Sequence, residues 1–339
     1  MPESSTESLA GYESIIPRMR DALGAVFDSL AGSANRERLA TIASAFAELG
    51  TAAPADRRAG VTRLLLEIDA LRGGASTAMM ESERLLLLSA VRGIVASSRL
   101  DAVPVSIRLQ LLHNWSQLLH TTPRALELFQ RERDTFASAC DTALLLRWAA
   151  GQFDWVRDGL PRRVLLDEGS LRSRASLLVQ IMRRLGGFRP VYFPHANGFR
   201  HNRSTMVELE ARRSYIRMAQ ALLEDPDVLG IATISWYHDP DLPTISPHLA
   251  WMNGIIEEGG GGVVRGGLAG GDSGAFENSL VRREAAERVG YVPRNGIVLW
   301  PRARVLAWAD RQTDITTDGP TIARLKKMLD AYPSNDVVG

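Results

Sequence analysis

Apolar residues recur at intervals of three and four through the first 150 residues of the chain. Two of these series are Leu23, Val26, Phe27, Leu30 and Leu64, Leu65, Ile68, Leu71. Such spacing places the apolar side chains on one face of a helix. Breaks rich in Gly, Pro, Ser or Asp separate the series at residues 32–35, 50–56, 72–77 and 101–104. The pattern predicts an all-helical N-terminal domain over residues 1–155.

Beyond residue 160, short runs of β-branched and aromatic residues alternate with longer helical segments. The expected strands are 163–169, 189–195, 228–237, 296–302 and 302–312, and the expected helices are 170–187, 204–226, 246–260 and 275–290, with one last helix from about residue 320. This alternation predicts an α/β domain with a mixed sheet over residues 160–339. The whole chain is therefore expected to be α+β, with its two parts joined near residues 151–161.

Composition and charge narrow the class of protein. The 339 residues are 45% apolar and 23% charged, as in ordinary globular proteins, and suffice for two domains. The net charge of +1 gives no field that would attract nucleic acid or an anionic membrane. Cys140 is the one cysteine, the chain begins without a signal-peptide pattern, and the most apolar run, 85–98, is too short to span a bilayer. A cytoplasmic protein is expected, and any homo-oligomer is expected to form through the helical domain.

A loop between an expected strand and the long helix at 204–226 has the features of an anion site. It carries Asn197, Gly198, Arg200, Asn202, Arg203 and Ser204. Exposed amides and the helix dipole at a helix N-terminus attract anions, and two arginines can clamp one. From Pro161 to Arg217 there are twelve arginines and four acidic residues, so the local field is positive. The loop is expected to bind an anionic cofactor or substrate tail, or else to be a solvated cap of the helix.

Histidines and aspartates gather at the ends of two expected strands. His195 ends one strand, and His238 with Asp239 ends the next. A right-handed crossover through one helix makes the two strands parallel, so their carboxyl ends should emerge together at the edge where α/β proteins bind ligands. His195, His238 and Asp239 are the candidate catalytic residues, with a histidine or aspartate as general base. Trp236, Tyr237 and His248 are expected to wall the substrate pocket.

Two alternatives remain for these residues. The histidines and aspartates at 195–248 are the candidates for a metal centre, although their spacings match no zinc signature and no metal is expected. Asp239 precedes Pro240, and aspartate in that position forms turns without any further function. Nearby, residues 259–274 contain nine glycines, which suits a lid or hairpin that covers the site.

The sequence resembles two groups of proteins. The motifs Ser-Trp-x-x-Asp-Pro at 235–240, Ile-Ser-Pro-x-Leu at 245–249 and Trp-Pro-Arg at 300–302 resemble those of an uncharacterised bacterial family. The second group is the acetyl-CoA-dependent N-acyltransferase fold. The chain resembles it in the order of its elements, which is strand, anion-binding loop, long helix, strand, helix and strand, and also in the segment 282–293. That resemblance implies that the loop at 197–204 would hold the pyrophosphate of coenzyme A. The chain departs from that pattern at Ala286, where a catalytic tyrosine is common, and in its glycine-rich insert.

The leading hypothesis is therefore an acyltransferase that uses acetyl-CoA or another acyl-CoA and acts on an amine or hydroxyl of a small molecule. A metal-dependent enzyme built on the His and Asp cluster is the second hypothesis. The third is a non-enzymatic protein that binds a small ligand or a partner. None of the three involves nucleic acid or a membrane.

Overall fold

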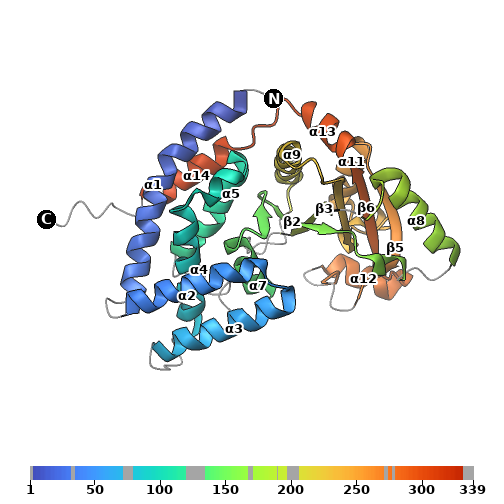
Figure 1. The fold of residues 1–339 in the computed structure, drawn as a ribbon. Helices are drawn as coiled ribbons and strands as arrows, with labels where there is room; N and C mark the ends of the chain where they lie inside the picture. The colour runs from blue at the N-terminus through green and yellow to red at the C-terminus, as the bar shows by residue number, and fades with distance from the viewer. Residues whose placement is uncertain are drawn as a thin grey trace. The chain divides into compact units, whose positions relative to one another are not determined.

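The computed structural model is a mixed α+β protein that divides into two compact units (Figure 1). It describes residues 3–31, 35–71, 79–119, 134–166, 171–188, 190–196, 206–270, 274–276 and 279–330. The first unit comprises residues 1–150, 197–201 and 316–339, and the second comprises 151–196 and 202–315.

Helices make up most of the first unit. They are α1 (Glu3–Ala31), α2 (Arg36–Glu48), α3 (Pro54–Leu71), α4 (Met79–Val95), α5 (Val105–Trp115), α7 (Asp134–Ala143) and α14 (Gly319–Asp330). Helix α4 is central, because it packs against α1, α2, α3 and α7. Its consecutive residues Leu85 to Leu88 are all buried, as expected of a helix surrounded by others. No helix in the described ranges is long and apolar enough to cross a bilayer.

The C-terminal helix belongs to the first unit, which differs from the expected domain of residues 160–339. Helix α14 packs between α1 and α5, although it is last in the sequence (Figure 1). The Ser8 hydroxyl donates to the Asp318 carboxylate at 2.7 Å, and the Gln110 amide donates to the Thr321 hydroxyl at 2.6 Å. All four side chains are buried. A short amphipathic helix reveals its apolar face in the sequence but not which surface will cover it.

A mixed, open sheet organises the second unit. Its strands in this unit are β2 (Phe153–Gly159), β3 (Pro190–Ala196), β4 (Gly230–Ser235), β5 (Gly262–Leu268) and β6 (Arg294–Pro301), in the order β2-β3-β4-β6-β5. The short strand β1 (Arg147–Ala149) belongs to the first unit. The β3–β4 pair is parallel, whereas β2–β3, β4–β6 and β5–β6 are antiparallel. Helix α9 (Glu208–Glu224) connects β3 to β4, and α11 (Trp251–Glu258) connects β4 to β5. The predicted parallel relation of the two strands that flank the long helix is confirmed.

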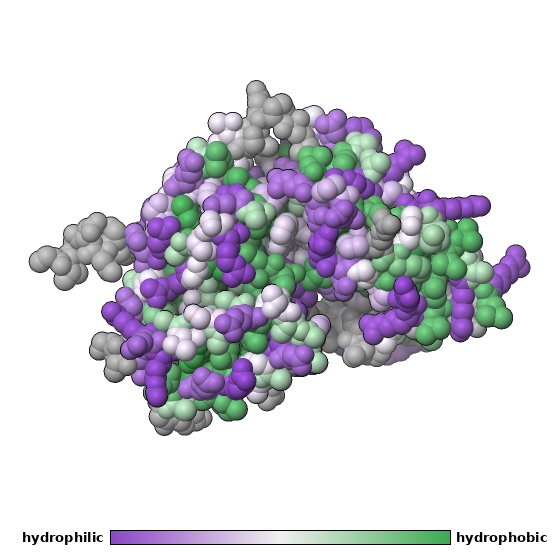
Figure 2. Space-filling model, viewed as in Figure 1, coloured by the Kyte–Doolittle hydropathy of each residue, from purple (hydrophilic) through white to green (hydrophobic). Residues whose placement is uncertain are grey.

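Each face of this sheet has its own apolar core. On one face, α8 (Leu171–Leu185) packs against β3, β4 and β6 through Leu177, Ile181, Leu185, Val191, Ala232, Ile297 and Leu299. The opposite face carries Trp300 of β6, Trp308 of α13 (Arg302–Asp310) and Tyr215 of α9, whose rings lie 5.2 to 6.5 Å apart. Trp300 and Trp308 are fully buried. Over the outer side of α8, apolar side chains reach the surface among arginines (Figure 2).

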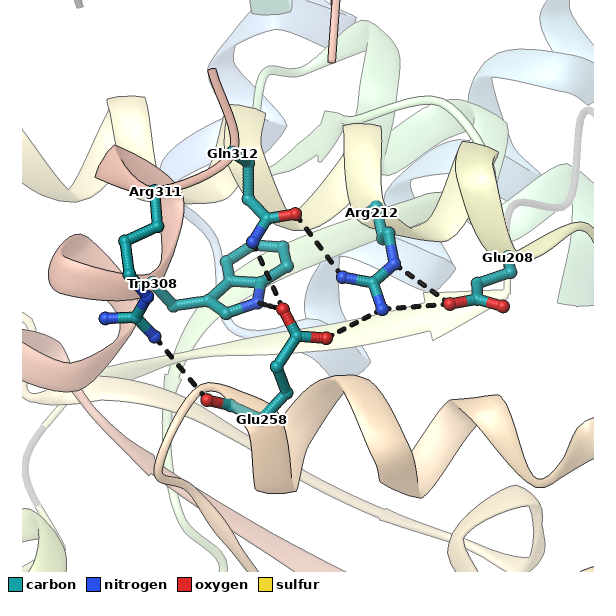
Figure 3. A network of polar contacts seen from close by, with 6 residues as sticks. All are labelled: Glu208, Arg212, Glu258, Trp308, Arg311 and Gln312. Carbon is teal, nitrogen blue, oxygen red and sulfur yellow. Dashed lines mark hydrogen bonds and ion pairs between the residues drawn. The ribbon is translucent and has the colours of Figure 1, made fainter. Parts of the chain in front are cut away.

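A polar network joins α9, α11 and α13 beside the tryptophans (Figure 3). The Glu258 carboxylate accepts from Arg212 at 2.7 Å and from the Trp308 indole at 3.1 Å. Gln312 donates to the same carboxylate at 3.2 Å and accepts from Arg212 at 3.3 Å. The Arg212 hydrogen bond is the main cause that lowers the pKa of Glu258. Because the carboxylate is 42% exposed, water weakens each pair, and the network mainly fixes the three helices in register.

Three predicted elements differ from the structure. Residues 302–312, expected as a strand, contain helix α13, in which Val305, Trp308 and Ala309 are buried at helical spacing. The first part of the expected strand at 163–169 lies in the 3-10 turn Arg162–Leu165, and residues 167–169 lie outside the described residues. The expected junction at 151–161 is largely β2, which pairs along its length with β3. In each case tertiary pairing or burial decided between conformations that the local sequence permits.

Candidate functional site

A cavity of about 690 Å³ lies at the carboxyl ends of β3 and β4, entirely within the second unit. Its volume is typical of a small-molecule site. Residues 193–196 of β3, residues 233–235 of β4 and the 3-10 turn Trp236–His238 line one side. Other lining residues include His248, Met252, Asn295 and residues 279–282 at the start of α12 (Leu280–Val289).

Few backbone hydrogen bonds join the two parallel strands beside the cavity. Leu229 N–H donates to Pro190 O at 3.0 Å, and Tyr192 pairs with Ile231, but the ladder goes no further. Pro194 has no N–H to donate, and its carbonyl accepts instead from the Thr233 hydroxyl at 3.2 Å. Beyond the Tyr192–Ile231 pair, a side-chain hydrogen bond replaces the backbone ladder, and the cavity lies at the carboxyl ends of the two strands.

His238 is fixed in one orientation on the cavity wall. It is 3% exposed, and its Nδ1 lies 2.9 Å from Oδ1 of Asn253 in α11. Because a carbonyl oxygen only accepts, Nδ1 carries the proton and Nε2 keeps its lone pair. Burial lowers the pKa of His238 to about 4, although the Asn253 hydrogen bond opposes that shift. The imidazole is thus neutral near pH 7, and Nε2 has no protein partner in the described part of the chain.

Backbone packing holds the turn that carries His238. Ser235 caps it by accepting from the Tyr237 N–H at 3.3 Å. Gly296 of β6 passes directly against it, and a Cβ there would lie 1.9 Å from the His238 carbonyl oxygen. Only glycine fits at that approach. The position of His238 therefore depends on a residue 58 positions later in the chain.

Asp239 does not line the cavity. It is fully buried, and its carboxylate accepts from the Tyr291 hydroxyl at 2.9 Å, Arg294 N–H at 2.9 Å and Asp241 N–H at 3.0 Å. A carboxylate with three donors is already satisfied. These contacts favour the turn-forming alternative over the catalytic role expected for Asp239.

The other expected site residues near the strand ends lie on the cavity wall. Trp236 and Tyr237 stack with ring centroids 3.9 Å apart. His248 lies on the short 3-10 turn Pro247–Leu249. His195, near the end of β3, lies 5.3 Å from the Phe193 ring, centroid to centroid. His195 and His238 thus line one cavity, as the parallel strands implied.

The glycine-rich segment is not a lid over its whole length. Residues Gly262–Leu268 form β5, which is hydrogen-bonded to β6 at the edge of the sheet. Gly274, at the end of the segment, does line the cavity. Glycines there allow the strand to lie close to its neighbours, as at Gly266, where a Cβ would be 2.9 Å from the Asn295 carbonyl.

The expected cofactor residues Asn197, Gly198, Arg200, Asn202, Arg203 and Ser204 lie outside the described residues. For the residues that are described, no three His, Cys, Asp or Glu side chains come together in a group that could hold a metal ion.

Two polar residues of the cavity were not predicted from the sequence: one lies on its wall, and the other holds His238 in place. Asn253 orients His238, and Arg282 reaches the cavity from the first turn of α12. The sequence shows Arg282 only as one of an Arg-Arg pair, and nothing local distinguishes it from Arg283. Asn253 follows Trp251 and Met252 in α11, and no local pattern marks it as a site residue.

Comparisons with protein-family models, with curated proteins and with solved structures find no match to this chain.

Proposed function

We propose that the second unit is an acyltransferase that moves an acyl group from acyl-coenzyme A to an amine or hydroxyl of a small molecule. The observation that carries the proposal is the cavity at the carboxyl ends of the parallel strands β3 and β4. Around it, the order β3, α9, β4, α11, β5 follows the N-acyltransferase-like order of elements noted in the sequence. The cavity offers a place where a thioester can meet its acceptor.

In the proposed reaction, the acceptor nitrogen or oxygen attacks the thioester carbonyl carbon. The new C–N or C–O bond forms, the C–S bond breaks, and the acceptor's proton ends on the sulfur of the free thiol. Nε2 of His238 accepts a hydrogen bond from the neutral nucleophile and relays the proton. Because burial keeps the pKa of His238 low, the imidazole passes the proton on and does not retain it.

The loop before α9 is the proposed site for the phosphates of coenzyme A. Arg200 and Arg203 would supply charge-assisted hydrogen bonds, and the chain around them is rich in arginine. Trp236 and Tyr237 would wall the acyl or acceptor group on the cavity side.

Binding of acetyl-CoA and longer acyl-CoAs, measured by calorimetry, tests the cofactor. The double variant Arg200→Gln/Arg203→Gln should weaken binding about 10- to 100-fold, because each lost charged hydrogen bond is worth roughly 1.5–3 kcal/mol and the losses overlap. Arg183→Gln, an exposed change on α8, is the matched control and should leave binding unchanged.

Release of free thiol from acyl-CoA, followed over a panel of small amines and alcohols, tests the chemistry. Turnover should fall at least about 100-fold in His238→Gln, as expected for loss of a proton-transfer group. Failure of millimolar acyl-CoA to bind would refute the proposal. Binding without thiol release from any acceptor would favour a ligand-binding protein instead.

A further inference from the structure

Arg282 is a buried arginine whose outer nitrogens have no hydrogen-bond acceptor among the residues that the structure describes. The residue is 6% exposed and lines the cavity. Its Nε donates to the Ala275 carbonyl, and its guanidinium carbon lies 4.6 Å from the centre of the Trp236 ring. Within the described ranges, Nη1 and Nη2 have no hydrogen-bond acceptor and no carboxylate. Burial lowers the pKa of Arg282, although the nearby Tyr237 and Tyr291 oppose that shift. A desolvated cation gains stability when an anion binds to it.

The start of α12 adds further donors at the same place. Ser279 caps the helix by accepting from the Arg282 N–H at 3.3 Å. The N–H groups of Leu280 and Val281 precede any intrahelical partner, and the described residues offer them no acceptor. Both residues line the cavity, so the positive end of the helix dipole and the arginine meet at one wall.

The remaining wall decides which anion fits. Arg282 is the one arginine or lysine among the described residues that line the cavity, and no aspartate or glutamate is among them. One fixed positive charge balances a single negative charge. Much of the rest is apolar or aromatic, including Phe153, Phe193, Met206 and Met252. A monoanion with an apolar body matches this surface better than a phosphate with two charges.

We infer that Arg282 and the first turn of α12 form a carboxylate subsite, which holds an acceptor that is an amino or hydroxy acid with an apolar body. The claim that the bound acid is the acceptor rests on the proposed acyl transfer. The claim that the subsite binds a carboxylate rests on the cavity alone. The two outer nitrogens of the Arg282 guanidinium donate hydrogen bonds to the two carboxylate oxygens. The Trp236 ring and the Ala275 carbonyl keep the guanidinium in place. The apolar body then extends along the wall formed by β3.

Paired probes test the subsite without knowledge of the natural acceptor. Binding of 4-fluorophenylacetate and of its neutral analogue 4-fluorophenylacetamide to the full chain is followed by fluorine NMR. The carboxylate should bind at least about tenfold more tightly than the amide, since a charged, bidentate pair is lost in the amide. Equal affinity of the two probes for the wild type would overturn the inference, whatever the variants do.

Neighbouring arginines provide the matched variants. Arg282→Gln should abolish the preference for the carboxylate, and Arg282→Lys should retain part of it. Arg283→Gln removes the same charge from an exposed position one residue later and should change nothing. Circular dichroism checks that each variant is folded. If Arg282→Gln and Arg283→Gln reduced the preference for the carboxylate equally, the preference would come from the overall positive charge of the region. That result would overturn the subsite.

Coenzyme A distinguishes the acceptor's carboxylate from a cofactor phosphate. If coenzyme A displaces the fluorinated carboxylate and itself binds more weakly to Arg282→Gln, the subsite holds a phosphate and the inference fails. If coenzyme A does not bind at all while the carboxylate preference depends on Arg282, the proposed acyl transfer fails and the carboxylate subsite remains.

Discussion

Replacing Asp239 separates a catalytic aspartate from an architectural one. Its buried carboxylate satisfies the Tyr291 hydroxyl and the N–H groups of Arg294 and Asp241. In Asp239→Ala all three donors lose their acceptor. Each buried donor left unsatisfied costs about 1–3 kcal/mol, and the three losses are not additive. We therefore expect the free energy of unfolding to fall by about 3–5 kcal/mol.

Two milder variants grade the effect. Asp239→Asn can keep its oxygen toward Tyr291 and Arg294, but its amide then faces the Asp241 N–H, so a loss of about 1.5–3 kcal/mol is expected. Tyr291→Phe removes one donor and should cost about 1 kcal/mol. Asp241→Asn is the control, because the Asp241 side chain is half exposed. Loss of its ion pair with Arg265 should lower the free energy of unfolding by at most about 1 kcal/mol.

Urea unfolding followed by tryptophan fluorescence measures these differences, with the slope compared between variants to check that one transition is being observed. Affinity for 4-fluorophenylacetate, measured below the transition, reports on the cavity separately. If Asp239→Ala lost less than about 1 kcal/mol while thiol release from acyl-CoA was abolished, the turn-forming role would be refuted and Asp239 would return to the catalytic residues.

Two further predictions concern the sheet and the cavity. Trp300→Ala should destabilise the protein by about 3–5 kcal/mol, because it empties a fully buried site and also removes the 3.0 Å bond to the Gly259 carbonyl; an unchanged urea midpoint would contradict this. The folded-state pKa of His238, about 4, lies below the usual value near 6.5, so the unfolded state binds a proton between those values and the folded state does not. Stability should therefore fall by about 2 kcal/mol from pH 7 to pH 5, and His238→Gln should lack this part of the loss. An identical pH dependence in that variant would show that His238 is not the cause.

Strong local patterns in the sequence predicted several elements correctly. The β-branched and aromatic runs at β3 and β4, with one long helix between them, gave both strands, and the handedness of such crossovers gave their parallel relation. The expectation that His195 and His238 would meet at one edge followed from this, because parallel strands end on the same side. These conclusions depend on periodicity and chain connectivity, which are properties of the sequence alone.

Weaker patterns were decided by tertiary partners. Residues 302–310 are apolar at spacings that suit either a strand or a helix, and packing of Trp308 against Trp300 and Tyr215 accompanies the helix. Residues 153–159 are mostly polar toward their end, yet pairing with β3 makes them a strand. Helix α14 has an apolar face that the sequence reveals, but α1 and α5 decide where it packs.

The roles of individual polar residues also required the tertiary structure. The sequence gives Asp239 before Pro240 and next to a histidine, and both a catalytic and a turn-forming role suit that context. Tyr291 and Arg294, more than fifty residues later, donate hydrogen bonds to the carboxylate, and these contacts favour the turn-forming role. Arg282 and Arg283 are identical neighbours in sequence, but the helix turns one toward Trp236 and the cavity and the other toward solvent. Periodicity determines which residues share a face of an element, whereas burial, and with it charge and protonation, is decided only when the elements pack together.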